Sequence, residues 1–111
     1  MQIEQNRQGA VTIIRPIGAL VGPDADAFKA VLSEAMSKSL GRLVVDASAV
    51  PWADSRGLEV LVEASDELAH SGQMLKLCGA GETLREVLEI TDLAAGFEHF
   101  HDATTAVRSF L

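Results

Sequence analysis

Short apolar runs and segments with helical spacing alternate strictly along most of this chain. Two strands are expected first, at Ile3–Arg7 and Val11–Ile17, and later strands at Leu43–Asp46, Met74–Cys78 and Gly96–Phe100. Helical spacing fills each gap between the later strands. Such alternation requires parallel neighbouring strands joined by crossover helices. The sequence therefore predicts an α/β fold of order β-β-α-β-α-β-α-β-α: a mostly parallel mixed sheet with an N-terminal hairpin and helices packed on it.

The expected helices begin and end at residues suited to helix termini. Proline fits a first helical turn, acidic side chains favour the positive end, and glycine often ends a helix. On these signals the helices run from Gly22 to Gly41, from Asp54 to near Gly72, over Glu82–Ile90, and from the cap Asp102 onward. The spacing in the second helix predicts a buried face made of Leu58, Leu61, Val62, Ser65, Leu68 and Ala69.

Length, charge and cysteine content narrow the class of protein. The 111 residues suit one domain spanning 1–111, and a single cysteine excludes an internal disulfide framework. No apolar run approaches the ~20 residues that cross a bilayer, and no signal peptide is recognisable, so we expect a cytoplasmic domain without membrane insertion. The net charge is −7 and the basic residues are scattered, which argues against direct binding to nucleic acid. No apolar surface stripe remains, and we expect a monomer.

The most informative segment joins the strand Leu43–Asp46 to the second helix. A seven-residue loop, Ala47 to Ala53, carries the only tryptophan, Trp52, and the helix then begins at Asp54-Ser55. Asp54 is suited to cap this helix, which leaves the Ser55 hydroxyl in the first turn near free backbone amides. A phosphate on Ser55 would add about 1.5–2 negative charges there and change the surface without unfolding the domain. The sequence therefore makes Ser55 a candidate phosphorylation site, although an aspartate-serine pair before a helix is also an ordinary cap.

This segment resembles the STAS domain, in particular that of anti-sigma factor antagonists. Members carry Asp-Ser-x-Gly-Leu after a buried strand, as in Asp54-Ser55-Arg56-Gly57-Leu58 here. They also carry a Leu-x-x-Thr-Gly-Leu-like end to the third helix, which is similar to Leu88–Leu93. The order and spacing of the elements match over nearly the whole chain.

The resemblance implies a non-enzymatic partner-switch protein that requires no cofactor. In such proteins the serine matching Ser55 is phosphorylated by an anti-sigma factor or a related histidine-kinase-like serine kinase, and a serine phosphatase restores it. The unphosphorylated form binds the kinase and frees its client. The residues expected to contact the partner are Asp54, Arg56, Gly57, Trp52 and Glu59.

Two positions depart from the family pattern. Many members have a second serine at the position of Arg56 and a small residue at the position of Glu59. Arg56 is able to pair with a phosphoserine or with Asp54, or to exclude the usual kinase. Glu59, Glu63 and Glu67 recur on one helix face, which indicates either a solvated face or a surface for a basic partner. Trp52 either contacts a partner or plugs the loop onto the core.

Other functions remain open at this point. The first is a STAS scaffold subunit, never phosphorylated, docked on a membrane transporter ATPase or another signalling complex. The second is a phospho-aspartate receiver or small enzyme centred on Asp46 or Asp54, which the position of Lys76 inside its strand disfavours. His99 and His101 form a weak metal-site pattern without a third ligand. Cys78 is expected to be a buried packing residue, and Gly79-Ala80-Gly81 lacks the remainder of a phosphate-loop motif.

Overall fold

The computed structural model describes all residues 1–111 and contains one five-stranded sheet with the strands in sequence order, β1-β2-β3-β4-β5. The strands are β1 (Gln2–Gln8), β2 (Val11–Ile17), β3 (Leu43–Asp46), β4 (Leu75–Cys78) and β5 (Phe97–Phe100). β1 pairs with β2 antiparallel, and the remaining neighbours are parallel. The predicted mixed sheet with an N-terminal hairpin is therefore confirmed.

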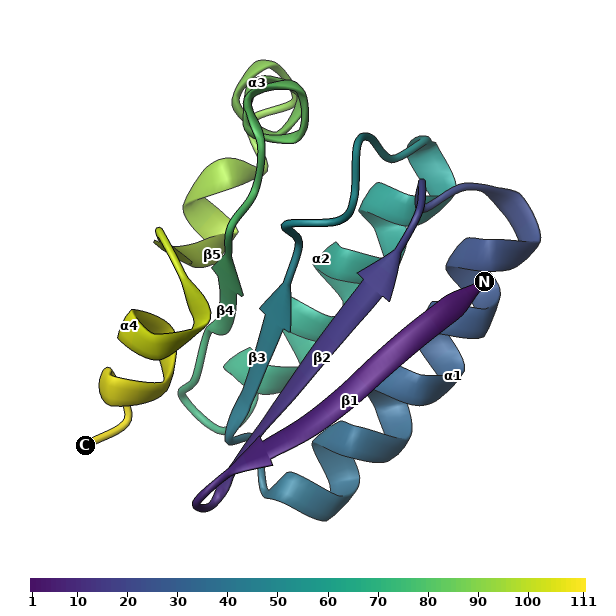
Figure 1. Cartoon of the computed structure of the whole chain (residues 1–111). Coiled ribbons are helices and arrows are strands. Elements are labelled where there is room, and N and C mark those ends of the chain that lie inside the picture. The colour runs from purple at the N-terminus through teal and green to yellow at the C-terminus, as the bar shows by residue number, and fades with distance from the viewer.

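Four α-helices connect and cover the strands in the predicted order (Figure 1). They are α1 (Gly22–Ser39), α2 (Ser55–Ala69), α3 (Glu82–Ile90) and α4 (Ala103–Arg108), and a short 3₁₀ helix, η1 (Ala94–Gly96), precedes β5. The sequence pattern did not predict η1, because three residues carry no periodicity. The caps at Asp54 and Asp102 are confirmed, since their carboxylates accept the N–H groups of Gly57 and Thr105 respectively.

The two faces of the sheet are covered unequally. α1 and α2 lie behind the sheet in Figure 1 and pack against Ile14, Val45 and Leu77 in the larger core cluster, to which α3 adds Leu84 and Leu88. α4 lies on the opposite face, where Val44 belongs to a smaller cluster. β3 is consequently buried on both faces, as its unbroken apolar sequence predicts.

The buried face of α2 differs in part from the prediction. Leu61, Ser65 and Leu68 are buried as expected, whereas Leu58 and Val62 are only half-buried and Ala69 is exposed. Small residues complete the buried face instead: it also contains Gly57, Val60 and Ala64. The helix is rotated toward its small side chains because its first turn approaches another backbone segment closely.

The chain after β2 passes over the start of α2 and is hydrogen-bonded to the loop after β3. Leu20 and Ala53 form a parallel bridge. The Leu20 N–H donates to the Trp52 carbonyl at 3.0 Å, and the Leu20 carbonyl accepts the Asp54 N–H at 3.1 Å. Backbone hydrogen bonds from the segment between β2 and α1 thus fix the loop after β3 and the first turn of α2.

Candidate functional site

Asp54 organises the candidate site at the carboxyl ends of β2 and β3. Its Oδ1 accepts the Gly57 N–H at 2.8 Å, which caps α2, and its Oδ2 accepts the Gly22 N–H at 3.1 Å at the start of α1. One carboxylate therefore links two helix N-termini. These hydrogen bonds, that from Gly57 first, lower the pKa of Asp54 below its ordinary value.

Ser55 is the first residue of α2 and is exposed to solvent. Because Asp54 accepts the capping hydrogen bond, the Ser55 hydroxyl is not needed to cap the helix. Free amides of the first turn lie nearby, and the positive end of the helix dipole favours an anion there by a few tenths to about 1 kcal/mol. The position can therefore accept a charged group without disturbing the core.

Gly57 is buried in the first turn of α2, where it touches the chain that precedes α1. A Cβ at this position would lie 2.2 Å from the Leu20 carbonyl oxygen and 3.0 Å from the Ala53 Cβ. The nearest contacting atom is a backbone carbonyl oxygen that accepts the Asp54 N–H, so it cannot move aside without breaking this hydrogen bond. Glycine is required here by close packing rather than by an unusual φ angle.

Arg56 is held by acidic side chains, none of which is Asp54. Its Nη2 lies 2.7 Å from Asp26 Oδ1, and its Nη1 lies 2.8 Å from Glu59 Oε1 and 3.7 Å from Glu63 Oε1. The hydrogen bond to Asp26, followed by the charges of the three carboxylates, raises the pKa of Arg56. In the unmodified protein Arg56 thus forms no ion pair with Asp54, whose carboxylate accepts two backbone N–H groups; how Arg56 pairs in the phosphorylated form stays a prediction.

The acidic face of α2, made of Glu59, Glu63 and Glu67, is partly neutralised by basic side chains. Glu63 Oε2 lies 3.1 Å from Lys29 Nζ, and Glu59 pairs with Arg56. The pKa of Glu63 is lowered, first by its hydrogen bond with Lys29. Of these three glutamates, only Glu67 forms no ion pair.

Trp52 lies in the loop directly before the site, and 48 % of its surface is exposed. Its backbone carbonyl is fixed by Leu20, so the side chain is displayed from an ordered loop rather than inserted into the core. Trp52 is therefore not a plug that joins the loop to the core, and its contact with a partner stays a prediction. Exposed tryptophan is enriched at protein interfaces.

Lys76 and Cys78, which the other hypotheses considered, lie outside this site. Lys76 is buried under α4, with its Nζ 3.3 Å from Glu98 and 4.6 Å from the centre of the Phe110 ring. Burial, followed by the charge of Asp46, raises the pKa of Cys78 to about 12, so its thiol is protonated at neutral pH. No group of three or more histidine, cysteine, aspartate or glutamate side chains is arranged to hold a metal ion. No helix is long and apolar enough to cross a membrane.

Comparison with known proteins identifies the family. The family model for the STAS domain matches residues 2–106, and the chain belongs to this family. Among solved structures, a candidate anti-sigma factor antagonist from Thermotoga maritima has a TM-score of 0.87 and 24% identity, covering 96% of this chain and 92% of that one. A STAS-domain anti-sigma factor antagonist from Planctomyces limnophilus has a TM-score of 0.85 and 20% identity over 96% of both chains.

The Bacillus cell-fate determinant SpoIIAA in its phosphorylated form has a TM-score of 0.73 and 17% identity, covering 99% of this chain and 100% of that one. At these identities the likeness shows the shared fold. Among curated protein sequences, none matches the chain significantly.

We predict that Gly57→Ala lowers the free energy of unfolding by about 2–4 kcal/mol, because the new methyl group would overlap the Leu20 carbonyl. Alanine otherwise favours a helix over glycine, so a loss would report the clash alone. Chemical denaturation measures it. The matched control is Gly81→Ala at the start of α3, where a Cβ meets nothing within 4 Å and a loss of at most about 1 kcal/mol is expected. Equal effects of the two substitutions would contradict the packing explanation.

We also predict that Asp54→Asn destabilises the protein at neutral pH, because asparagine has one acceptor oxygen where aspartate uses two, and its –NH2 group cannot accept the second backbone N–H. The pKa of Asp54 is lowered in the folded state, so its contribution is present above its ordinary value of 3.8 and is lost as the pH falls through the lowered pKa. The difference between wild type and variant, measured by urea denaturation from pH 7 to pH 3, should therefore shrink at the acidic end. A difference that stays constant over this range would show that the carboxylate charge is not involved.

Proposed function

We propose that this STAS domain is an anti-sigma factor antagonist whose binding is controlled by phosphorylation of Ser55. The observation that carries the proposal is the exposed Ser55 hydroxyl at the N-terminus of α2, left free because Asp54 caps the helix. The family pattern around Asp54-Ser55 and the likeness to SpoIIAA, solved in unphosphorylated and phosphorylated forms, support it. The partner is an anti-sigma factor that acts as a histidine-kinase-like serine kinase, and a serine phosphatase reverses the modification.

The proposed mechanism is a change of surface rather than of fold. The unphosphorylated face presents Ser55 and Trp52 on an ordered loop and helix start, and the partner binds there. A phosphate on Ser55 places a dianion beside the Asp54 carboxylate and within the part of the interface that the partner must desolvate. Because a buried charge without a partner costs several kcal/mol, binding weakens and the protein is released.

Arg56 gives this chain a feature that a second serine would not supply. In the unmodified state its guanidinium forms ion pairs with Asp26 and Glu59. We propose that phosphorylation draws Arg56 from these carboxylates toward the phosphate, since charge-assisted hydrogen bonds to a dianion are stronger than surface ion pairs. Asp26 and Glu59 are then left unpaired and add negative charge to the released form. The domain itself performs no catalysis in this scheme.

The proposal predicts that Ser55→Asp loses binding to the cognate kinase, while Ser55→Ala binds but accepts no phosphate. Calorimetry with the purified kinase measures binding, and mass spectrometry after incubation with ATP locates the phosphate. The matched control is Thr83→Asp, which places the same charge at an exposed position in the first turn of α3. Equal affinity of wild type and Ser55→Asp would contradict the switch. Binding without phosphate on Ser55 would instead favour the scaffold function.

Trp52 provides a direct readout, because the chain has one tryptophan and no tyrosine. We predict that kinase binding shifts the fluorescence emission to shorter wavelength as the half-exposed indole is buried. Trp52→Ala should weaken binding about tenfold or more, as for a central aromatic contact, without lowering the midpoint of thermal unfolding. Unchanged emission on saturation with the kinase would place the contact away from this loop.

A further inference from the structure

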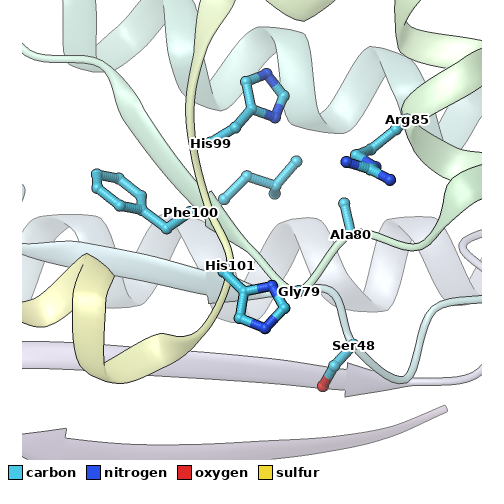
Figure 2. Close-up of a pocket in the computed structure, with 8 residues that line it drawn as sticks. Ser48, Gly79, Ala80, Arg85, His99, Phe100 and His101 are labelled. Carbon is cyan, nitrogen blue, oxygen red and sulfur yellow. The ribbon is translucent and has the colours of Figure 1, made fainter.

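A cavity that the switch proposal does not use lies at the carboxyl ends of β3, β4 and β5. Its volume is about 560 Å³, which is within the range of small-molecule sites. Figure 2 shows Ser48, His99, His101 and Arg85 set around it, contributed by the loop after β3, by β5, by the segment after β5 and by α3. This is the edge of a parallel sheet at which ligands commonly bind.

The side chains that line the cavity include basic and hydrogen-bonding groups but no acidic group. The chain has sixteen acidic residues, yet none of the eight residues that line the cavity is acidic. The polar side chains present are Arg85, two of the three histidines and the Ser48 hydroxyl. In a protein of net charge −7 this is a concentration of hydrogen-bond donors and positive or potentially positive groups.

Arg85 is the strongest of these groups, and it forms no ion pair. Glu82, Glu86 and Glu89 of its own helix share a shallow groove with it, but none of them reaches the guanidinium. These glutamates lie outside the cavity lining and limit the strength of the local field. The guanidinium is consequently available to an anion with acceptor oxygens in a plane.

His99 and Ser48 each form one contact within the protein and keep a second polar site for a ligand. His99 Nε2 lies 2.8 Å from the Ala94 carbonyl and must donate to it, so Nδ1 is the ring nitrogen that remains for a ligand. Arg15 Nε lies 3.4 Å from Ser48 Oγ, which leaves the Ser48 hydroxyl proton free to donate.

The cavity wall is also rigid on one side. Gly79 has φ +69°, and a Cβ there would lie 2.9 Å from the Ser48 Cβ, so the loops after β3 and β4 are in close contact. The following α3 has Gly81 as its N-cap and no side-chain cap, and its first amides, which have no partner within the helix, border a neighbouring groove. Of residues 80–90, only Ala80 and Arg85 line the cavity itself.

We propose that this cavity binds the phosphate group of a small molecule, either free phosphate or a phosphate monoester. The polar side chains come from four segments of the chain and surround the cavity (Figure 2), which suits the three terminal oxygens of a phosphate better than the two of a carboxylate. Arg85 is the principal contact, and Ser48, His99 and His101 complete it. Since Ser48 belongs to the loop that leads to Ser55, the bound anion would contact the opposite end of that loop from the switch.

The test is titration of ¹⁵N-labelled protein with inorganic phosphate and with phenyl phosphate, followed by amide chemical shifts. Saturable shifts at Ala80, Gly81 and Ser48 are expected. Tighter binding of phenyl phosphate would identify an ester site, and tighter binding of inorganic phosphate a free-phosphate site. Absence of saturable binding at millimolar concentrations, shifts confined to other surfaces, or equally tight binding of benzoate would overturn the proposal.

Variants within and outside the cavity distinguish phosphate binding at this site from nonspecific attraction of anions to basic side chains. Arg85→Gln should weaken binding about tenfold or more, as expected for a lost charge-assisted contact. Arg42→Gln removes a charge from another exposed arginine without an ion pair and should leave affinity unchanged. His101→Gln changes a second side chain of the cavity lining and should also weaken binding. Ser55→Ala should bind as wild type, so the result is independent of the switch proposal. Equal binding by wild type and both cavity variants would overturn the assignment.

Discussion

The Asp54 carboxylate is the interaction on which the arrangement of the site depends. It holds the start of α2 through Gly57 and the start of α1 through Gly22, so two helices that are separate in sequence share one anchor. Backbone hydrogen bonds of Leu20 to the loop complete this connection. Together they explain how an irregular loop can present Trp52 and Ser55 in fixed positions.

Close packing and hydrogen bonding reinforce each other at this anchor. The absence of a side chain at Gly57 lets the Leu20 carbonyl approach α2, and that approach brings the Asp54 N–H within hydrogen-bond distance of the same oxygen. A larger residue at position 57 would separate the segments and so break the backbone contact as well. The glycine of the family pattern is thus explained by the fold, independently of any role in binding a partner.

The sequence predicted those features that depend on neighbouring residues. The order of strands and helices along the chain, the helix starts and the caps at Asp54 and Asp102 follow from local chemistry, and the structure has them as expected. The pairing of Arg56 with Asp26 was not predictable, because Asp26 lies thirty positions away and meets it only when α1 and α2 pack together. The burial of Lys76 depends in the same way on distant aromatic rings. The rotation of α2 was missed because glycine and alanine carry little hydrophobic signal.

The ion pairs around Arg56 have a consequence for the kinetics of association. Asp26, Glu59 and Glu63 surround this arginine, and Lys29 is the other cation in contact with them, so acidic groups predominate beside Ser55. Their field extends over roughly a Debye length, about 8 Å at physiological ionic strength. A basic surface would be guided toward this face by diffusion in that field, and added salt would slow the encounter more than it shortened the lifetime of the complex.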